Sequence, residues 1–272
     1  MSFISGKVTS KDGTTIAYSR RGKGPAVILV DGALCSRALG PMAKLAEALA
    51  PSFTVFDYDR RGRNESGDTA PYSIEREIED LGALIEVAGG SAFVFGASSG
   101  AMLALRAAAV LPGVKKLAMY EAPITIAGSP EPVPPDRVAE IVALVNEGRL
   151  SEATKTFMKM VGAPGFAIFM TRLMPGIWSK LTAAAATLPH DFAALGDTGP
   201  GKPLPADVTA ALAGVKVPTL VGVGGKSPAW MKFTAETLAG RIAGAELETL
   251  PGQDHMVKEK AQAPVLAKFF GR

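Results

Sequence analysis

The sequence predicts an α/β fold with a mostly parallel sheet, helices on both faces and an inserted helical segment. Short apolar runs alternate with segments of helical periodicity up to residue 122 and again after residue 213. Strands that alternate with helices form parallel sheets covered on both faces. Between residues 123 and 213 only helix-like stretches and proline-rich connectors are found. We therefore expect a core domain at 1–122 and 214–272 and a helical cap at 123–213.

The first part of the chain begins with a hairpin. Residues 8–10 and 14–18 are β-prone and flank Asp12-Gly13, a strong signal for a tight turn. The strands that follow are continuous apolar runs, which is typical of strands buried on both faces of a sheet. The further elements expected here are strands at 26–30, 53–58, 92–95 and 116–120, and helices at 37–50, 74–88 and 99–111.

The second part of the chain starts with the insertion and then returns to the alternating pattern. Open α/β sheets bind ligands at the carboxyl ends of their strands, so we expect the inserted helices to cover that edge. Their predicted positions are near 137–146, 151–161 and 166–187. Strands at 219–223 and 245–250 and helices near 230–242 and 259–269 complete the core.

Composition excludes several classes of protein. The net charge of +3 is spread over 29 basic and 26 acidic residues without a dense Lys/Arg run, which argues against nucleic-acid and membrane partners. The single cysteine, Cys35, forms no internal disulfide; we expect it to be a small buried residue in a reducing compartment. No secretory h-region and no bilayer-length apolar stretch is found, so we expect a cytoplasmic protein. Homo-oligomerisation is left open.

The sharpest motif is Gly96-Ala97-Ser98-Ser99-Gly100, between a predicted strand and a predicted helix. A serine in such a strand-to-helix turn projects its hydroxyl above the sheet, and the flanking glycines avoid a clash. The alternative is a small-residue turn without chemistry. Because the motif has the required context, we expect Ser98 to be a nucleophile.

A nucleophilic serine needs a base, and the chain has two histidines. His255 follows the last predicted strand, at the same edge of the sheet as Ser98, and is the expected base. His190 lies in the insertion beside Asp191, and we interpret it as a surface or satisfied polar residue.

These motifs resemble the α/β-hydrolase superfamily, in the branch with a helical cap after the sixth strand. The resemblance covers nearly the whole chain and implies an eight-stranded sheet. It also implies an oxyanion hole formed by the backbone N–H groups of Ala33 and Ser99, where losing one donor costs about 10²–10³ in rate. The segments that carry it are Val30-Asp31-Gly32-Ala33, Asp59-Arg60-Arg61-Gly62, the turn at Ser98, residues 218–224, and His255.

Two positions depart from the family pattern. Asp31 stands where the family usually has histidine, and we expect a structural role for it, with Arg37 or Arg61 as a partner. The loop 224–228 lacks the acid that the family most often has there. We assign that acid to Glu121, which keeps the order Ser, acid, His; the alternative is a corner that ends a strand. Asp254 is a poor partner for His255, because successive side chains diverge.

A serine at this turn favours acyl transfer through an acyl-enzyme. We expect a cofactor-free, metal-free serine hydrolase that cleaves a carboxylic ester of a small to medium apolar substrate, since no dinucleotide motif, P-loop or histidine cluster is found. Lactone or C–C bond hydrolysis, and a degenerate hydrolase that only binds a small molecule, remain alternatives. The residues expected to line the substrate pocket are Leu34, Met158, Phe169, Trp178 and Trp230.

Overall fold

The computed structural model describes residues 3–272, which build an eight-stranded sheet in the order β1-β2-β4-β3-β5-β6-β7-β8. The first hairpin and its junction with β4 are antiparallel, and the other neighbours are parallel. The fold class predicted from the sequence is therefore confirmed. The strands are β1 (Ile4–Thr9), β2 (Thr15–Arg21), β3 (Ala26–Val30), β4 (Thr54–Tyr58), β5 (Ala92–Ala97), β6 (Val114–Tyr120), β7 (Thr219–Gly224) and β8 (Glu246–Leu250).

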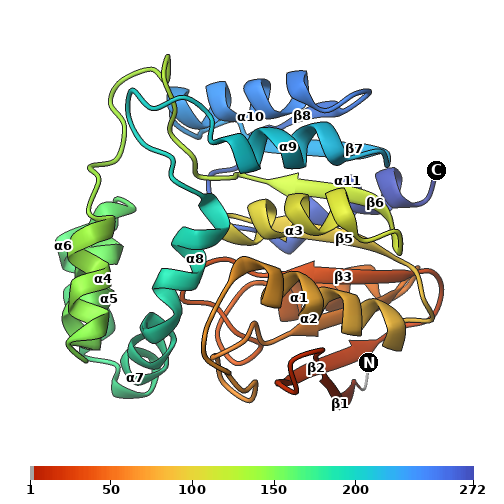
Figure 1. Ribbon diagram of the computed structural model, residues 1–272, viewed down its shortest axis with the longest axis horizontal. Coiled ribbons are helices and arrows are strands. Elements are labelled where there is room, and N and C mark those ends of the chain that lie inside the picture. The colour runs from red at the N-terminus through yellow and green to blue at the C-terminus, as the bar shows by residue number, and fades with distance from the viewer. Residues whose placement is uncertain (1–2) are drawn as a thin grey trace.

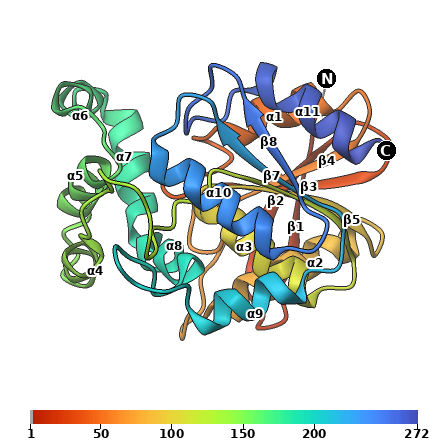
Figure 2. The ribbon, with the colours of Figure 1, turned by 90° about the horizontal axis from the view of Figure 1, so that it is seen from above.

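Helices cover both faces of this sheet (Figure 2). On one face, α1 (Met42–Leu49) and α11 (Glu259–Phe270) pack in a single apolar cluster with the strands. On the other face lie α2 (Ile74–Val87), α3 (Ser99–Val110), α9 (Ala206–Gly214) and α10 (Ala229–Arg241). Residues Val27 to Val30 of β3 are 0% exposed, so both sides of this strand are buried, as its continuous apolar run predicts.

The inserted helices form a separate group beside the sheet, on the left of Figure 1. This group comprises α4 (Val138–Asn146), α5 (Leu150–Met160), α6 (Gly165–Arg172), α7 (Pro175–Ala184), a 3₁₀ turn (Ala185–Thr187) and α8 (Leu188–Leu195). The prediction of one helical stretch at 166–187 is wrong, because the helix is interrupted before Pro175. Proline lacks an N–H and therefore begins a new helix, α7.

Two helices were not expected from the sequence, α8 and α9. Although α9 falls within the range expected for the cap, its Val208 and Leu212 belong to the same apolar cluster as α3 of the core. The insertion therefore returns to the sheet before its last helix. Among residues 3–272, no helix combines the length and the apolar character that a bilayer span needs.

Candidate active site

Ser98 occupies the sharp turn between β5 and α3. Its φ of 57° and ψ of −129° place it in a region that side chains rarely adopt. A Cβ on Gly96 would collide with the carbonyl oxygen of Gly100, and a Cβ on Gly100 would collide with that of Val30. Glycine is therefore required on both sides of Ser98, and the turn presents the serine as a nucleophile elbow does.

The structure brings Ser98, His255 and Glu121 together. His255 Nε2 lies 3.2 Å from Ser98 Oγ, although the residues are 157 positions apart in the chain. On the other side of the ring, Nδ1 lies 3.2 Å from Oε2 of Glu121, whose side chain is 0% exposed. The hydroxyl, ring and carboxylate thus form the linear arrangement in which a carboxylate orients a histidine and the histidine deprotonates a serine.

The loop after β7, which lacks a carboxylate, supplies donors to Glu121 instead. The N–H of Gly224 donates to Oε1 at 2.6 Å, and the Ser227 hydroxyl donates to the same oxygen at 2.5 Å. The other oxygen of Glu121 is left for the histidine. The carboxylate of Asp254 faces away and accepts the Met256 N–H at 3.1 Å.

Two backbone segments meet beside Ser98 where an oxyanion hole is expected. Ala33 and Ser99 both line the same cavity as Ser98 and His255. A Cβ on Gly32 would lie 2.9 Å from the Ser98 Cβ, so this loop passes directly alongside Ser98. Ser99 is the first residue of α3, and its N–H has no acceptor within the helix. The positive end of the helix favours negative charge at this point.

A buried ion-pair network connects the inserted helices to this region, and sequence reasoning missed it. Oδ1 of Asp191, on α8, accepts from Arg60 at 2.7 Å. Nη2 of Arg63 donates to both carboxylate oxygens of Asp191, at 2.8 and 2.7 Å. Arg60 also donates twice to Glu77, at 2.7 Å each. Burial raises the pKa of Asp191, but the charges of Arg63 and Arg60 outweigh it and hold the pKa below its usual value.

The same network holds both segments of the expected oxyanion hole. Arg63 donates to the carbonyl oxygen of Gly32 at 2.6 Å. The Ser99 hydroxyl donates to Asp191 at 2.6 Å. Asp191 and its two arginines therefore fix the positions of the segments that contain Ala33 and Ser99.

Replacing Asp191 by asparagine is expected to lower the free energy of unfolding by about 3–5 kcal/mol, because two buried guanidinium groups lose their shared counter-ion. Urea unfolding followed by circular dichroism measures this change. Asp197→Asn is the matched control, since Asp197 pairs with Lys202 at the surface with its side chain 85% exposed; its midpoint should not move. Equal midpoints for the two variants would contradict the role given to Asp191.

Asp31 does not pair with Arg37 or Arg61, so that part of the expectation is wrong. Arg37 binds Asp59 at 3.0 Å, and Arg61 binds Asp80 at 2.7 Å, so both guanidinium groups have other carboxylate partners. Oδ1 of Asp31 accepts the N–H of Gly32 at 2.9 Å, and Oδ2 has no hydrogen-bond partner among residues 3–272. Burial raises the pKa of Asp31 to about 7 from an ordinary 3.8. The carboxyl is thus largely protonated below neutral pH.

Asp31 makes stability depend on pH. Between about pH 4 and about pH 7 the native chain holds a proton that the unfolded chain releases, so this residue's contribution falls as pH rises, by up to about 1.4 kcal/mol per pH unit. Asp31→Asn removes the effect. Urea midpoints at about pH 5 and about pH 8 should show that the stability of the variant relative to the parent protein is greater at the higher pH. A constant difference between the two proteins would show that Asp31 titrates normally.

The cavity beside Ser98 has a volume of about 230 Å³. Of the five residues predicted to line it, only Trp230 does so; Met231 lies beside it, and Phe157, Met160 and Val161 of the α5 segment contribute the opposite wall.

Leu34, Met158, Phe169 and Trp178 are corrections to the predicted pocket. Leu34 is buried in the cluster formed by the inserted helices, which Met158 also joins; successive residues of a helix such as α5 point in different directions. Phe169 is 56% exposed. Trp178 donates from its indole to Ser151 at 3.1 Å, within the inserted helices.

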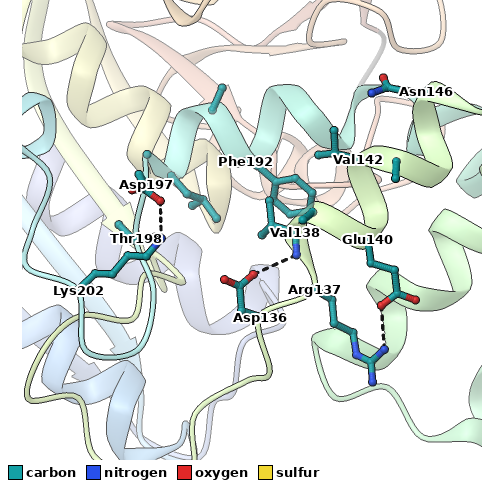
Figure 3. A pocket seen from close by; sticks show the side chains of 15 residues that line it. Asp136, Arg137, Val138, Glu140, Val142, Asn146, Phe192, Asp197, Thr198 and Lys202 are labelled. Atoms are coloured by element: carbon teal, nitrogen blue, oxygen red, sulfur yellow. Dashed lines mark hydrogen bonds and ion pairs between the residues drawn. The ribbon is translucent and has the colours of Figure 1, made fainter.

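A second, more open groove adjoins the cavity on the side of α4 and α8, with a volume of about 900 Å³ (Figure 3). Four of its five charged side chains form ion pairs: Arg137 with Glu140 at 2.9 Å, and Lys202 with Asp197 at 2.6 Å. It contains neither Ser98 nor His255. The residues that line both spaces are Asp136, Val138, Phe192, Leu195 and Thr198.

His190 and Cys35 lie outside the residues that line the cavity. His190 stacks on Tyr72 with ring centroids 3.7 Å apart, and burial lowers its pKa, so the ring is neutral. Cys35 is half-buried, and burial raises the pKa of its thiol. A protonated thiol is a poor nucleophile.

Comparison with known proteins places the chain in a family. Residues 31–263 match the model of the alpha/beta hydrolase family. The structure of an alpha/beta hydrolase from Sphaerobacter thermophilus DSM 20745 has 49% sequence identity and a TM-score of 0.85, and covers 97% of this chain and 100% of its own. The chain belongs to the alpha/beta hydrolase family, and it is a hydrolase of the α/β fold. The resemblance inferred from the sequence motifs is thereby confirmed.

Two further relatives are more distant or match over less of the chain. The "Uncharacterized hydrolase YraK" of Bacillus subtilis (strain 168) is 35% identical over 97 residues, which are 34% of this chain and 35% of that protein. The alignment thus spans about a third of this curated relative. The esterase EaEST from Exiguobacterium antarcticum has 18% identity and a TM-score of 0.75 over 99% of this chain and 100% of its own, a likeness of fold alone.

Proposed function

We propose that the protein is a serine hydrolase that cleaves carboxylic esters of small to medium apolar substrates through an acyl-enzyme. The observation that carries this proposal is the contact of His255 with Ser98 Oγ on one side, at 3.2 Å, and with the buried Glu121 on the other, at 3.2 Å. The apolar walls of the adjoining cavity favour an apolar acyl group.

In the proposed reaction, His255 Nε2 accepts the proton of Ser98 as Oγ forms a bond to the ester carbonyl carbon. The carbonyl oxygen becomes negative and accepts hydrogen bonds from the N–H groups of Ala33 and Ser99. The bond to the alcohol oxygen then breaks, and His255 donates the proton to the departing alcohol. Water, deprotonated by His255, attacks the acyl-enzyme, and the acid leaves as Ser98 regains its proton. Glu121 holds the ring and stabilises the imidazolium.

Two features of the sequence also fitted a degenerate hydrolase that only binds a small molecule: the missing acid after β7 and the carboxylate at Asp31. Glu121 reaches His255 from β6, and the raised pKa of Asp31 reduces the negative charge near the expected oxyanion hole. Both observations favour an enzyme over the binding protein.

Labelling with a serine-reactive phosphonate tests the proposal. We expect a single adduct on Ser98, located by peptide mass spectrometry, and turnover of simple esters at rates above those of lactones and diketones under matched conditions. A folded sample that forms no adduct and hydrolyses no ester would overturn the proposal. Preferential turnover of lactones or diketones would replace the ester by that substrate class while keeping the serine.

A further inference from the structure

We propose that this cavity selects acyl groups without charge and rejects those that carry a carboxylate. The inference rests on the proposed function and deepens it by fixing one property of the substrate. Among the residues that line the cavity, none is lysine or arginine, whereas Glu121, Asp136 and Asp191 contribute carboxylates. A bound anion would therefore find no cation among the lysine and arginine side chains. Asp191 is paired with Arg60 and Arg63, and Glu121 faces His255, so Asp136 is the lining carboxylate without an ion pair to any residue in 3–272.

The nearest buried cations are already committed. Arg60 and Arg63 have side chains 1% and 0% exposed and point at Asp191, which they neutralise. They lie behind Asp191 and Ser99, to which Arg60 also donates at 3.1 Å. Asp191 and Ser99, which accept hydrogen bonds from these guanidinium groups, thus lie between them and an acyl carboxylate in the cavity.

The cations of the neighbouring groove are committed as well. Figure 3 shows Arg137 directed at Glu140 and Lys202 directed at Asp197. Asp136, which lines both spaces, accepts the Val138 N–H at 3.1 Å through Oδ1 and forms no ion pair within residues 3–272. It adds a negative charge where the cavity meets the groove.

The size and walls of the cavity strengthen this selection. The volume of about 230 Å³ is small for a ligand pocket, since such pockets usually measure about 300–1,000 Å³. An acyl carboxylate in so small a space loses its hydration shell. The wall of Phe157, Trp230 and Met231 is apolar and provides no cation to replace the lost water. The same field helps to expel the acid product, which becomes an anion when it forms.

Two ethyl esters of nearly equal shape test the charge preference: ethyl 4-methylpentanoate and monoethyl succinate, in which a carboxylate replaces the terminal branched carbon and its methyl groups. Ethyl methyl succinate is a third substrate that is polar but neutral. With ethanol release as the readout, we expect kcat/KM for both neutral esters to exceed that for monoethyl succinate by about 10²-fold, because the carboxylate loses hydration in the cavity without gaining a cation, and Asp136 adds a smaller repulsion.

A pair of variants tests the origin of the preference. Asp136→Asn keeps the acceptor for the Val138 N–H and removes the charge, so the ratio of neutral to anionic kcat/KM should fall roughly 3-fold, as for two charges some 6 Å apart in water. Glu86→Gln is the control: Glu86 is exposed on α2, lines neither space and forms no ion pair within residues 3–272, so the ratio should not change.

The outcomes separate this inference from the proposed function. Equal turnover of the succinate monoester and the neutral esters would overturn the inference and leave the serine hydrolase standing. Labelling of Ser98 without turnover of any neutral ester would also overturn it. Absence of both labelling and turnover would overturn the proposed function itself.

Discussion

A Ser98→Ala variant is expected to lose ester hydrolysis by about 10⁴- to 10⁶-fold in kcat, with its fold intact. In the proposed reaction this hydroxyl supplies the atom that forms the acyl-enzyme, and no other hydroxyl among the described residues contacts His255. Residual turnover would come from the oxyanion donors and from binding alone. Steady-state kinetics with a neutral ester, together with the loss of phosphonate labelling, measure this effect.

The control for Ser98→Ala is Ser91→Ala. Ser91 is exposed and precedes the same strand at its opposite end, so its loss should leave kcat unchanged. Both variants should unfold near the parent temperature, because the Ser98 hydroxyl contacts only the half-exposed His255 ring. Parent-like turnover by a well-folded Ser98→Ala variant would remove Ser98 from the mechanism.

Local sequence signals were sufficient for the core of the fold and for the turn that carries Ser98. A strand covered on both faces has to be apolar at every position, and residues 26–30 have that property, so β3 is predicted with the bounds that the structure shows. The Gly-x-Ser-x-Gly turn is recognisable because backbone collisions at Gly96 and Gly100 restrict those positions to glycine. Such constraints act within a few residues, and a single sequence records them.

The ion-pair network could not be predicted because its partners are distant in the chain. Asp191 meets Arg60 across 131 positions and Arg63 across 128. The motif Asp59-Arg60-Arg61-Gly62 was noted as part of the family resemblance, but nothing local assigns its arginines to α8, a helix that the sequence did not predict. Two arginines that follow a buried strand and need buried counter-ions are the signal that could have directed attention to the insertion.

The pocket prediction failed for a different reason. Composition identifies aromatic and methionine residues in the insertion, but only the rotation of each helix decides which of them face the core. Phe157 and Met160 are three positions apart on α5 and share a side that lines the cavity, whereas Phe169 on α6 faces solvent. Small errors in the predicted helix bounds, such as missing the interruption before Pro175, change the directions in which the side chains are expected to point.

Replacing Glu121 by glutamine is expected to lower kcat by about 10³- to 10⁴-fold, since the histidine then holds its proton on the wrong nitrogen. Gly224 and Ser227 both donate to Oε1, so the amide oxygen of glutamine has to occupy that position. The NH₂ group then faces His255 Nδ1, which must accept, and Nε2 carries the proton. A protonated Nε2 cannot take the proton of Ser98.

Asp254→Asn distinguishes Glu121 from the carboxylate next to His255 in sequence. Asp254 contacts the Met256 N–H and Lys258, at 3.1 and 3.3 Å, so its loss should change kcat less than about 3-fold, an effect of the size found for groups outside a catalytic unit.

The loss of kcat in Ser227→Ala should lie between those of Glu121→Gln and Asp254→Asn. Glu121 keeps the Gly224 donor but loses one hydrogen bond, so kcat should fall about 10-fold, as for one hydrogen bond to a charged group. The ranking Glu121→Gln, Ser227→Ala, Asp254→Asn follows from which atoms touch the ring. A larger loss for Asp254→Asn than for Glu121→Gln would transfer the role of triad acid to Asp254 and show that the loop bearing His255 rearranges before it reacts.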